Sequence, residues 1–422
     1  MLVEQILPNA VKQAYVYNAA DQLTGIGWAD KDDQVIGSLG YGYHPQSGRL
    51  SAQTGSYAPQ LLPPASQGDN TFDANHRQTR FEGTALHYDA NGNLTEAGGR
   101  RYVWNARNQL VEVREGTQLV ASYRYDALGR RIAKQENGGT IEYLYDGLNP
   151  IQEKAGETIN PILTGLGVDE YYARNEAIGR TYFLSDHQNS TRALTNAAGQ
   201  VVNRYDYDPY GNVQQSKTGF SNPYQYTGRE RDQTGLMYYR ARYYRPDMGR
   251  FIAEDPIGLA GGLNTYVYVE GNPLMYADHL GLAVYLCSRP VNVDWVPMSM
   301  RPYLRHMWVK TSTTEARMAG ECPVPGQGCA DVPYSATKNK SHAGQSALSG
   351  SICVFQQNVD EACVNSKINQ GQPTGTWSMV NQYQSFSNAV VAQCRYGPQD
   401  GPLVPNALHS RDPLGSRFSP KP

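Results

Sequence analysis

The sequence predicts an all-β spiral sheet that forms part of a shell, followed by a small α+β C-terminal domain. Three observations predict this organisation. Tyrosine is abundant, with 31 in 422 residues, but only five of them follow Leu282. A hairpin-like phrase recurs through the first part of the chain. All six cysteines follow Leu282, so the chemistry of the chain changes at that residue.

The repeated phrase is an aromatic alternation, a turn former with a following Gly or polar residue, and a short apolar alternation. A period of two is typical of half-buried strands, and Asp or Asn followed by Gly is typical of the turn that joins them. Each unit is therefore predicted to be a β-hairpin of about 20 residues that stacks on its neighbours. The phrase occurs at residues 15–26, 41–55, 86–99, 102–113, 123–139 and 205–215.

These units resemble the YD repeats of the Rhs and teneurin type. The segment GRFIAEDPIGLAGGLNTYVYVEGNPLMYADHLGL, residues 249–282, is similar to the Rhs repeat-associated core that closes such arrays. In that family the repeats form a shell around a variable toxin, but this repeat region is too short to enclose a cargo alone. The resemblance implies a YD-repeat β scaffold over residues 1–204, a core and self-cleavage junction over 205–282, a C-terminal toxin domain over 283–400 and a Pro-rich tail over 401–422.

Two short phrases echo each other across the core. They are EDPIGL at residues 254–259 and ADHLGL at residues 277–282. The resemblance implies that Asp255 and Asp278 act together as an aspartyl autoprotease. Two adjacent carboxylates suit this chemistry, because one stays protonated and polarises a carbonyl while the other activates water. The alternative is that both aspartates are turn formers.

The family's cleavage point maps onto the bond between Leu282 and Ala283, and the resemblance places an arginine, here Arg250, beside the two aspartates. Its alternative role is a structural salt bridge. His279 stands where the family has proline, and it does not fix the backbone φ angle as proline does. We therefore expect self-cleavage after Leu282, with His279 as a departure that weakens the expectation.

The six cysteines predict disulfides. Their spacing contains no CxxC pair, so neither a zinc site nor any other metal site is expected. Disulfides persist in oxidising compartments, so the C-terminal domain is expected to act in the periplasm or outside cells. Buried free thiols remain the alternative, and the pairing stays open. The candidates are Cys287, Cys322, Cys329, Cys353, Cys363 and Cys394.

The C-terminal part is predicted to hold strands at 283–291 and 306–313, a loop region at 320–350 and a helix over Asn381–Cys394. The helix is predicted because Tyr383, Phe386, Val390, Val391 and Cys394 form one apolar stripe, which is first of all a core face.

This order of elements loosely resembles circularly permuted papain-fold peptidases and amidases. His306 matches the base of that family, and Ser385 stands in the helical turn that carries the family's nucleophilic cysteine. A peptidase or amidase acting on the cell wall is therefore one hypothesis. A non-catalytic binding or pore-forming domain is a second, and an inactive, truncated orphan module is a third. A nuclease is disfavoured because no paired His-Asn-His or acidic-Lys pattern is present.

The net charge is −2, and the basic residues are scattered, so no nucleic-acid partner is expected. No cofactor is predicted. No apolar run approaches 18 residues and the N-terminus lacks a signal-peptide pattern, so neither a transmembrane segment nor a signal peptide is expected. The resemblance implies delivery to a target cell by secretion machinery or a VgrG- or PAAR-type carrier, as in type VI secretion, and a cognate immunity protein.

Overall fold

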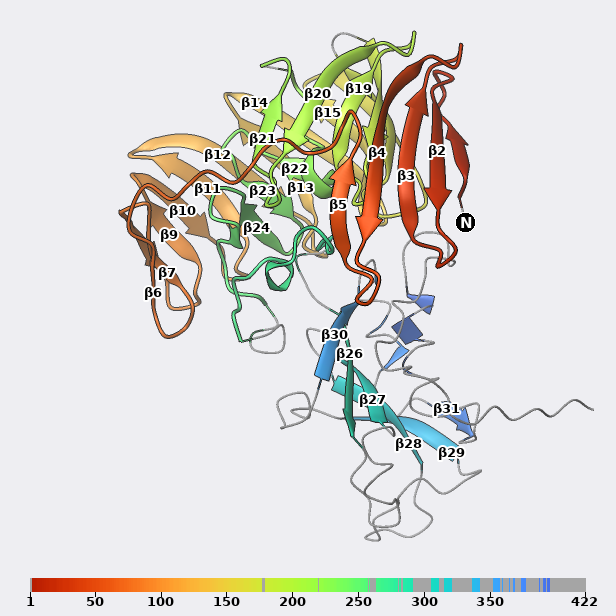
Figure 1. Ribbon diagram of the computed structural model, residues 1–422. Helices are drawn as coiled ribbons and strands as arrows, with labels where there is room; N and C mark the ends of the chain where they lie inside the picture. The colour runs from red at the N-terminus through yellow and green to blue at the C-terminus, as the bar shows by residue number, and fades with distance from the viewer. Residues whose placement is uncertain are drawn as a thin grey trace, which may run out of the picture.

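The computed structural model describes residues 2–176, 179–218, 220–256, 258, 263–279 and 281, then the strands of a C-terminal sheet and single residues between 359 and 394. These residues form four sheets in which all pairings of neighbouring strands are antiparallel (Figure 1). The order of strands in the first three sheets follows the order in the sequence. The fold is therefore a series of hairpins, as the repeats predict.

The first sheet has five strands and the second has sixteen. The strands of the first sheet are β1 (Glu4–Ile6), β2 (Lys12–Tyr17), β3 (Leu23–Ala29), β4 (Val35–Tyr43) and β5 (Leu50–Thr54). Those of the second are β6 (Thr71–Phe72), β7 (Gln78–Phe81), β8 (Thr84–Tyr88), β9 (Leu94–Ala97), β10 (Arg100–Trp104), β11 (Leu110–Glu115), β12 (Gln118–Tyr125), β13 (Arg131–Glu136), β14 (Gly139–Asp146), β15 (Asn149–Ala155), β16 (Thr158–Thr164), β17 (Tyr171–Glu176), β18 (Gly179–Ser185), β19 (Thr191–Thr195), β20 (Val201–Tyr207) and β21 (Val213–Gln215). All six predicted repeats are hairpins of these two sheets.

The turn of a repeat shows why the phrase forms a hairpin. Asp126, which follows β12, accepts hydrogen bonds at Oδ1 from the main-chain N–H groups of Leu128 and Arg130, both at 2.9 Å. Gly129 has a φ of 84°, which glycine adopts without strain. The Asp and the Gly of the phrase thus close the loop, and the tyrosines before it belong to the strand.

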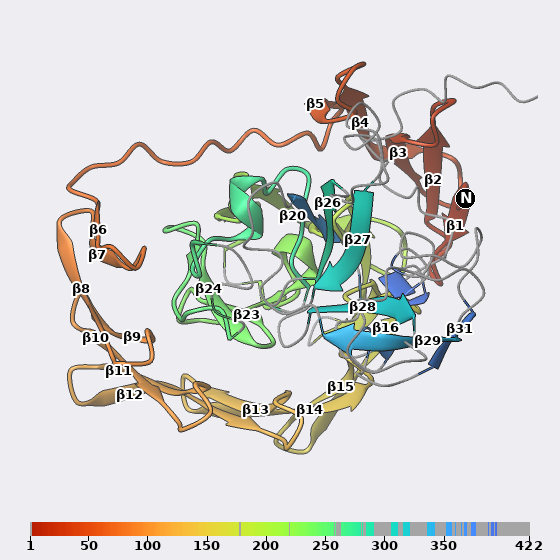
Figure 2. The ribbon, with the colours of Figure 1, turned by 90° about the horizontal axis from the view of Figure 1, so that it is seen from below.

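The sixteen-stranded sheet curves around the segment from residue 222 to residue 281, which we call the plug (Figure 2). The plug contains η1 (Tyr226–Gly228), β22 (Glu230–Arg231), β23 (Met237–Tyr239), β24 (Arg242–Arg245), β25 (Arg250–Phe251) and η3 (Val269–Gly271). The expected division after residue 204 falls within β20, and the domain boundaries stay a prediction.

Tyrosines make the contact between the curved sheet and the plug. Tyr125 of β12 and Tyr243 of β24 place their hydroxyl oxygens 2.9 Å apart. Tyr171 of β17 and Tyr224 of the plug have ring centroids 4.3 Å apart. Rings of this kind bury a large apolar area. The core of the shell is therefore built from the residue type that dominates the repeats.

The five-stranded sheet packs against β17, β18 and β19 of the second sheet. Ile26, Trp28 and Leu39 share one buried cluster with residues of those strands. Asn9 donates hydrogen bonds to the Thr195 side chain at 3.0 Å and to the Asn196 carbonyl at 2.9 Å. Residues 55–70 then run from β5 to β6, across the open side of the curve (Figure 2).

A six-stranded sheet follows the plug, in the order β30-β26-β27-β28-β29-β31. It lies below the curved sheet in Figure 1. Its strands are β26 (Val284–Pro290), β27 (Arg305–Lys310), β28 (Glu315–Gly320), β29 (Ala336–Ser341), β30 (Ile352–Gln356) and β31 (Pro373–Thr376).

The predictions for the C-terminal part are largely confirmed. The strands predicted at 283–291 and 306–313 are β26 and β27. The prediction of a loop over 320–350 is wrong where β29 lies, because β29 is polar and is defined by pairing with β28 and β31 instead of by an apolar pattern. Of the predicted apolar stripe, Val390, Val391 and Cys394 are buried in one cluster, whereas Tyr383 and Phe386 lie outside the described residues.

Candidate functional site

Arg242, at the start of β24, brings together the two aspartates that the sequence singled out. Its Nη2 atom lies 3.0 Å from Asp255 Oδ2 and 3.4 Å from Asp278 Oδ2. All three side chains are buried. A charge this deep in the protein is stable only with charged or polar partners, and the guanidinium and the two carboxylates supply them for one another.

The guanidinium of Arg242 also binds two main-chain carbonyls, one before and one after Asp278 in the sequence. Arg242 Nε donates a hydrogen bond to the Gly281 carbonyl at 2.7 Å, and Nη1 donates to the Thr265 carbonyl at 3.3 Å. One face of the group stacks on the Phe251 ring, with 3.6 Å from Cζ to the ring centroid. The rigid fork of an arginine allows all these contacts at once.

Gly281 fits tightly against the hairpin of β23 and β24. Its φ is 66°, and a Cβ atom added to it would lie only 2.4 Å from the Tyr239 carbonyl oxygen. Both facts require glycine at this position. Leu282 and Ala283 lie outside the described residues, but they directly follow the residue that this contact fixes.

Tyr268 supplies a neutral hydroxyl near Asp278. Burial raises the pKa of Tyr268 to about 12, and the charge of Asp278 contributes to the increase. The Tyr268 hydroxyl lies 3.2 Å from that of Tyr239. It therefore stays protonated at neutral pH.

The arginine between the aspartates is Arg242 and not Arg250. Arg250 Nη2 donates instead to the His76 carbonyl at 2.5 Å and to Asn264 Oδ1 at 3.3 Å, and its guanidinium faces the Phe72 ring. Sequence reasoning missed Arg242 because an arginine in a strand is usually exposed. The tyrosines that flank it in β24 are the only local signal that this strand is buried on both faces.

His279, which replaces the family's proline, is also buried. Its Nδ1 atom lies 2.9 Å from Asp169 Oδ2. Burial by itself would raise the pKa of Asp169, but Arg229, Arg240 and His279 around it hold the pKa well below its usual value. Asp169 is therefore a carboxylate, and no pattern in the sequence indicates its contact with His279.

Of the two candidate catalytic residues of the C-terminal domain, only His306 lies among the described residues. His306 lies on β27, opposite Arg289 of β26, and Ser385 lies outside the described residues. The nearby Ser387 is buried, so a substrate has no access to it in this conformation. The peptidase hypothesis for His306 and Ser385 stays a prediction.

Two observations concern the cysteines. Cys394 is buried and disulfide-bonded. Cys287 of β26 and Cys353 of β30 are direct partners in the strand register, which brings their Cα atoms within the range that a disulfide spans. The pairing of the six cysteines stays a prediction.

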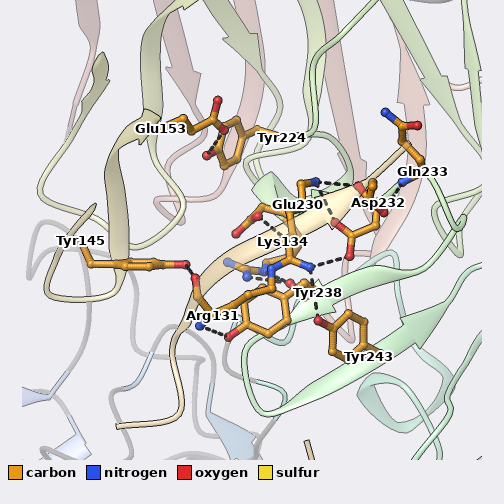
Figure 3. Close-up of polar contacts among 12 residues, drawn as sticks. Arg131, Lys134, Tyr145, Glu153, Tyr224, Glu230, Asp232, Gln233, Tyr238 and Tyr243 are labelled. Atoms are coloured by element: carbon orange, nitrogen blue, oxygen red, sulfur yellow. Dashed lines mark hydrogen bonds and ion pairs between the residues drawn. The ribbon is translucent and has the colours of Figure 1, made fainter. Parts of the chain in front are cut away.

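A second group of buried charges joins the plug to the curved sheet (Figure 3). We call it the Arg131 cluster: Arg131, Lys134, Glu136, Glu230 and Asp232. Arg131 contacts Glu230 at 2.6 Å and Asp232 at 2.5 Å, and Lys134 contacts Asp232 at 2.9 Å and Glu136 at 3.2 Å. Burial alone would lower the pKa of Arg131, but the adjacent Asp232 raises it well above the usual value. Arg131 and Lys134 lower the pKa of Asp232 against the effect of its burial, whereas burial and the Asp232 charge raise the pKa of Glu136.

In the part of the chain that the structure describes, no group of three or more His, Cys, Asp or Glu side chains is arranged to hold a metal ion. Among the same residues, no helix is both long and apolar enough to cross a membrane.

The fold and the buried junction define the class of this protein: a shell of repeated hairpins that is filled by an internal plug. A family model described as Teneurin YD-shell matches residues 4–264, more than half of the chain. The chain belongs to the teneurin YD-shell family. The resemblance to YD repeats that the sequence indicates is thereby confirmed.

Known relatives share the repeat part with this chain. It is 33% identical over 229 residues to the tRNA nuclease WapA of Bacillus subtilis, which covers 51% of this chain and 10% of that protein. It is 28% identical over 337 residues to the double-stranded DNA deaminase toxin A of Burkholderia cenocepacia, which covers 66% of this chain and 23% of that protein. The chain thus spans less than a quarter of the length of either relative.

A solved structure is also similar to this chain. The crystal structure of TcdB2-TccC3-Cdc42 aligns with a TM-score of 0.48 at 20% identity, over 66% of this chain and 19% of that one.

Proposed function

We propose that this chain is the C-terminal part of an Rhs-type toxin for interbacterial competition, and that it cleaves itself after Leu282 to release the segment that follows. Relatives that share its repeat part are named as toxins or nucleases. The observation that carries the self-cleavage proposal is the contact of Arg242 with Asp255, Asp278 and the Gly281 carbonyl. Two carboxylates and a fixed main chain meet one residue before the expected bond.

The proposed reaction is the hydrolysis of the Leu282–Ala283 peptide bond. One aspartate takes a proton from water, whose oxygen adds to the Leu282 carbonyl carbon. The other aspartate, in its protonated form, donates its proton to the carbonyl oxygen. The first aspartate then gives the proton that it took from water to the leaving nitrogen, and a hydroxyl of the tetrahedral intermediate returns a proton to the second aspartate. The C–N bond breaks, which leaves a carboxyl group on Leu282 and an amino group on Ala283. Arg242 holds the preceding carbonyl, so the reacting group is presented in one orientation.

The mass of the purified chain tests this proposal. We expect two fragments, residues 1–282 and 283–422, and one full-length species after Asp278→Asn or Asp255→Asn. Asp247→Asn is the matched control, because Asp247 forms an exposed ion pair with Arg245 at 2.9 Å and should leave cleavage unchanged. A parent chain that stays at full length under all conditions would refute self-cleavage.

The activity of the released segment is a separate proposal. A disulfide-containing peptidase or amidase that acts in the periplasm is one candidate, supported by the disulfide at Cys394. A cytosolic nuclease is the other, favoured by the names of the relatives. Because relatives with different named activities share the repeat part, the shell does not decide between them.

Expression of the whole chain in two compartments separates these candidates. Loss of viability only when the chain is sent to the periplasm, with cut cell-wall stem peptides, would support the peptidase. Loss of viability only in the cytoplasm, with degraded nucleic acid, would support the nuclease and would also contradict the expectation of no nucleic-acid partner.

A further inference from the structure

We propose that Asp169, Arg240 and His279 form a clamp that holds the chain between Asp278 and Gly281 in the position required for cleavage. His279 is then a positioning residue of this chain, although it stands where the family has proline. The inference rests on the self-cleavage proposed above, and the experiments below separate its failure from the failure of self-cleavage.

Asp169 provides the fixed side of the clamp. It lies in the connection between β16 and β17 and is fully buried. Its main-chain N–H donates to Asn149 Oδ1 at 2.9 Å, and Gly228 packs so closely that a Cβ atom there would lie 2.7 Å from the Asp169 carbonyl oxygen. The carboxylate also receives Arg229 Nη1 at 2.5 Å. Its position is therefore set by the shell and the plug, independently of the junction.

His279 is held at its side chain and at its main chain. The ionised carboxylate of Asp169 can only accept hydrogen bonds, so Nδ1 of His279 carries the proton and donates across the 2.9 Å contact. The His279 carbonyl accepts a hydrogen bond from Arg240 Nη1. Arg240 Nη2 also contacts Asp169 Oδ1 at 2.7 Å. The Asp169 carboxylate and the Arg240 guanidinium thus both bind His279, the residue directly after Asp278.

The backbone conformation of Arg240 supports the proposed clamp. Its φ is 57° in the turn between β23 and β24, a conformation that costs a residue with a side chain more than it costs glycine. The side chain gains three partners there: Asp169, His279 and the Leu148 carbonyl at 3.0 Å. A strained residue persists when its surroundings fix it, and here those surroundings include the junction.

The clamp does for this chain what proline does covalently. Proline fixes φ near −65° without help from other residues, whereas histidine has a free φ and has to be held by contacts. Asp255 and Asp278 can act on the next carbonyl only if the chain from Asp278 to Gly281 keeps one path. The replacement of proline is therefore compatible with cleavage, because the Asp169 and Arg240 contacts supply the missing restraint.

Substitutions at His279 test the clamp through the rate and the site of cleavage. His279→Leu removes the donor, whereas His279→Asn keeps one near the position of Nδ1 and His279→Pro restores the covalent restraint. We expect His279→Leu to slow cleavage about tenfold to a hundredfold, as for the loss of a hydrogen bond to a charged group. We also expect mixed N-termini in its released fragment. The Asn and Pro variants should stay within a few fold of the parent and cut only before Ala283.

Hydrogen exchange in the uncleavable Asp278→Asn chain gives a readout that does not require cleavage. We expect His279→Leu to speed exchange at residues 275–281 about tenfold, with β13 and β14 unchanged. Cleavage and exchange both at parent values in His279→Leu would overturn the clamp, even if self-cleavage is real. If the parent never cleaves, self-cleavage fails and exchange alone decides the clamp. If the melting temperature of the Leu variant lies far below that of the parent, the cleavage and exchange rates of the Asn and Pro variants are compared with the parent instead.

Discussion

Two buried groups of charges involve the plug and look alike in composition, but they differ in what they hold. The ion pairs of the Arg131 cluster join β13 of the shell to Glu230 and Asp232 of the plug, and Glu136 also accepts a hydrogen bond from the Gln233 main-chain N–H at 3.0 Å. Arg242 contacts two aspartates as well, but it also binds the main-chain carbonyls of Thr265 and Gly281. We call Arg242, Asp255, Asp278 and Gly281 the junction cluster.

The comparison of the two clusters shows how structural charges can be distinguished from functional ones. Charged side chains are buried in both clusters, so burial alone does not identify a reactive site here. The Arg131 cluster fixes two elements of secondary structure relative to each other. The junction cluster fixes a single turn of irregular chain that leads directly to the expected cleavage point. Removing a charge should therefore affect folding in the first cluster and chemistry in the second.

The largest expected effect is on stability, at Arg131. Arg131→Met should lower the free energy of unfolding by about 3–5 kcal/mol, because it leaves Glu230 and Asp232 buried without their cation. Denaturant unfolding of the uncleavable Asp278→Asn chain measures it. The control is Arg124→Ala, which breaks an exposed pair with Glu142 and should cost less than about 1 kcal/mol. Equal losses in the two variants would remove the structural role of the cluster.

The next largest effect is on cleavage, at Arg242. Arg242→Lys keeps the charge but loses the fork that contacts Gly281, so we expect cleavage to slow about a hundredfold. Its melting temperature should fall less than that of Arg131→Met. The time course of fragment formation after synthesis measures the rate. A lysine variant that cleaves at the parent rate would show that the guanidinium geometry is not needed.

A smaller effect is expected at Gly281. Gly281→Ala introduces a Cβ atom against the Tyr239 carbonyl at a positive φ, which should cost about 1–3 kcal/mol of local strain. We expect a fall in the cleavage rate with little change in global unfolding, since the rest of the plug is untouched. Gly271→Ala, at a positive φ with open space around it, is the matched control for backbone strain alone.

The smallest effect on stability at neutral pH is expected at Asp169, and its contribution becomes visible in acid. Its pKa is lowered in the folded chain, so its stabilising contribution is complete above the unfolded pKa of about 3.9 and is lost as the pH falls through the folded pKa. The parent should lose stability below about pH 4, and Asp169→Asn should show a shallower loss. Melting temperatures between pH 6 and pH 2.5 test this, and parallel curves for the two chains would contradict it.

Much of the fold and half of the site could be predicted from the sequence. The hairpins follow from local patterns, since each Asp and Gly of the repeat acts within its own turn. Asp255 and Asp278 were found because they lie in two matching phrases. The packing of the first sheet on β17 to β19 had no local signal, because no pattern in the chain states which faces meet.

The rest of the site depends on contacts between distant residues. Arg242 lies in the run RARYYR, whose composition is typical of an exposed basic strand. In the folded plug, however, Arg242 is buried. His279 was interpreted only as a lost proline, because its partner Asp169 is 110 residues away in the sequence. Both residues gain their roles from tertiary burial, which changes a solvated side chain into a fixed donor.

The packing of the first sheet has a consequence for how the chain acquires its structure. Each strand of the sixteen-stranded sheet pairs with its neighbour in sequence, and such local contacts form early. Asn9 and Thr195 instead meet across 186 residues. During synthesis, β1 to β5 emerge before β17 to β19, so Ile26, Trp28 and Leu39 lack this partner surface until the later strands are made. We expect this interval to be the period in which the nascent chain is most prone to aggregate.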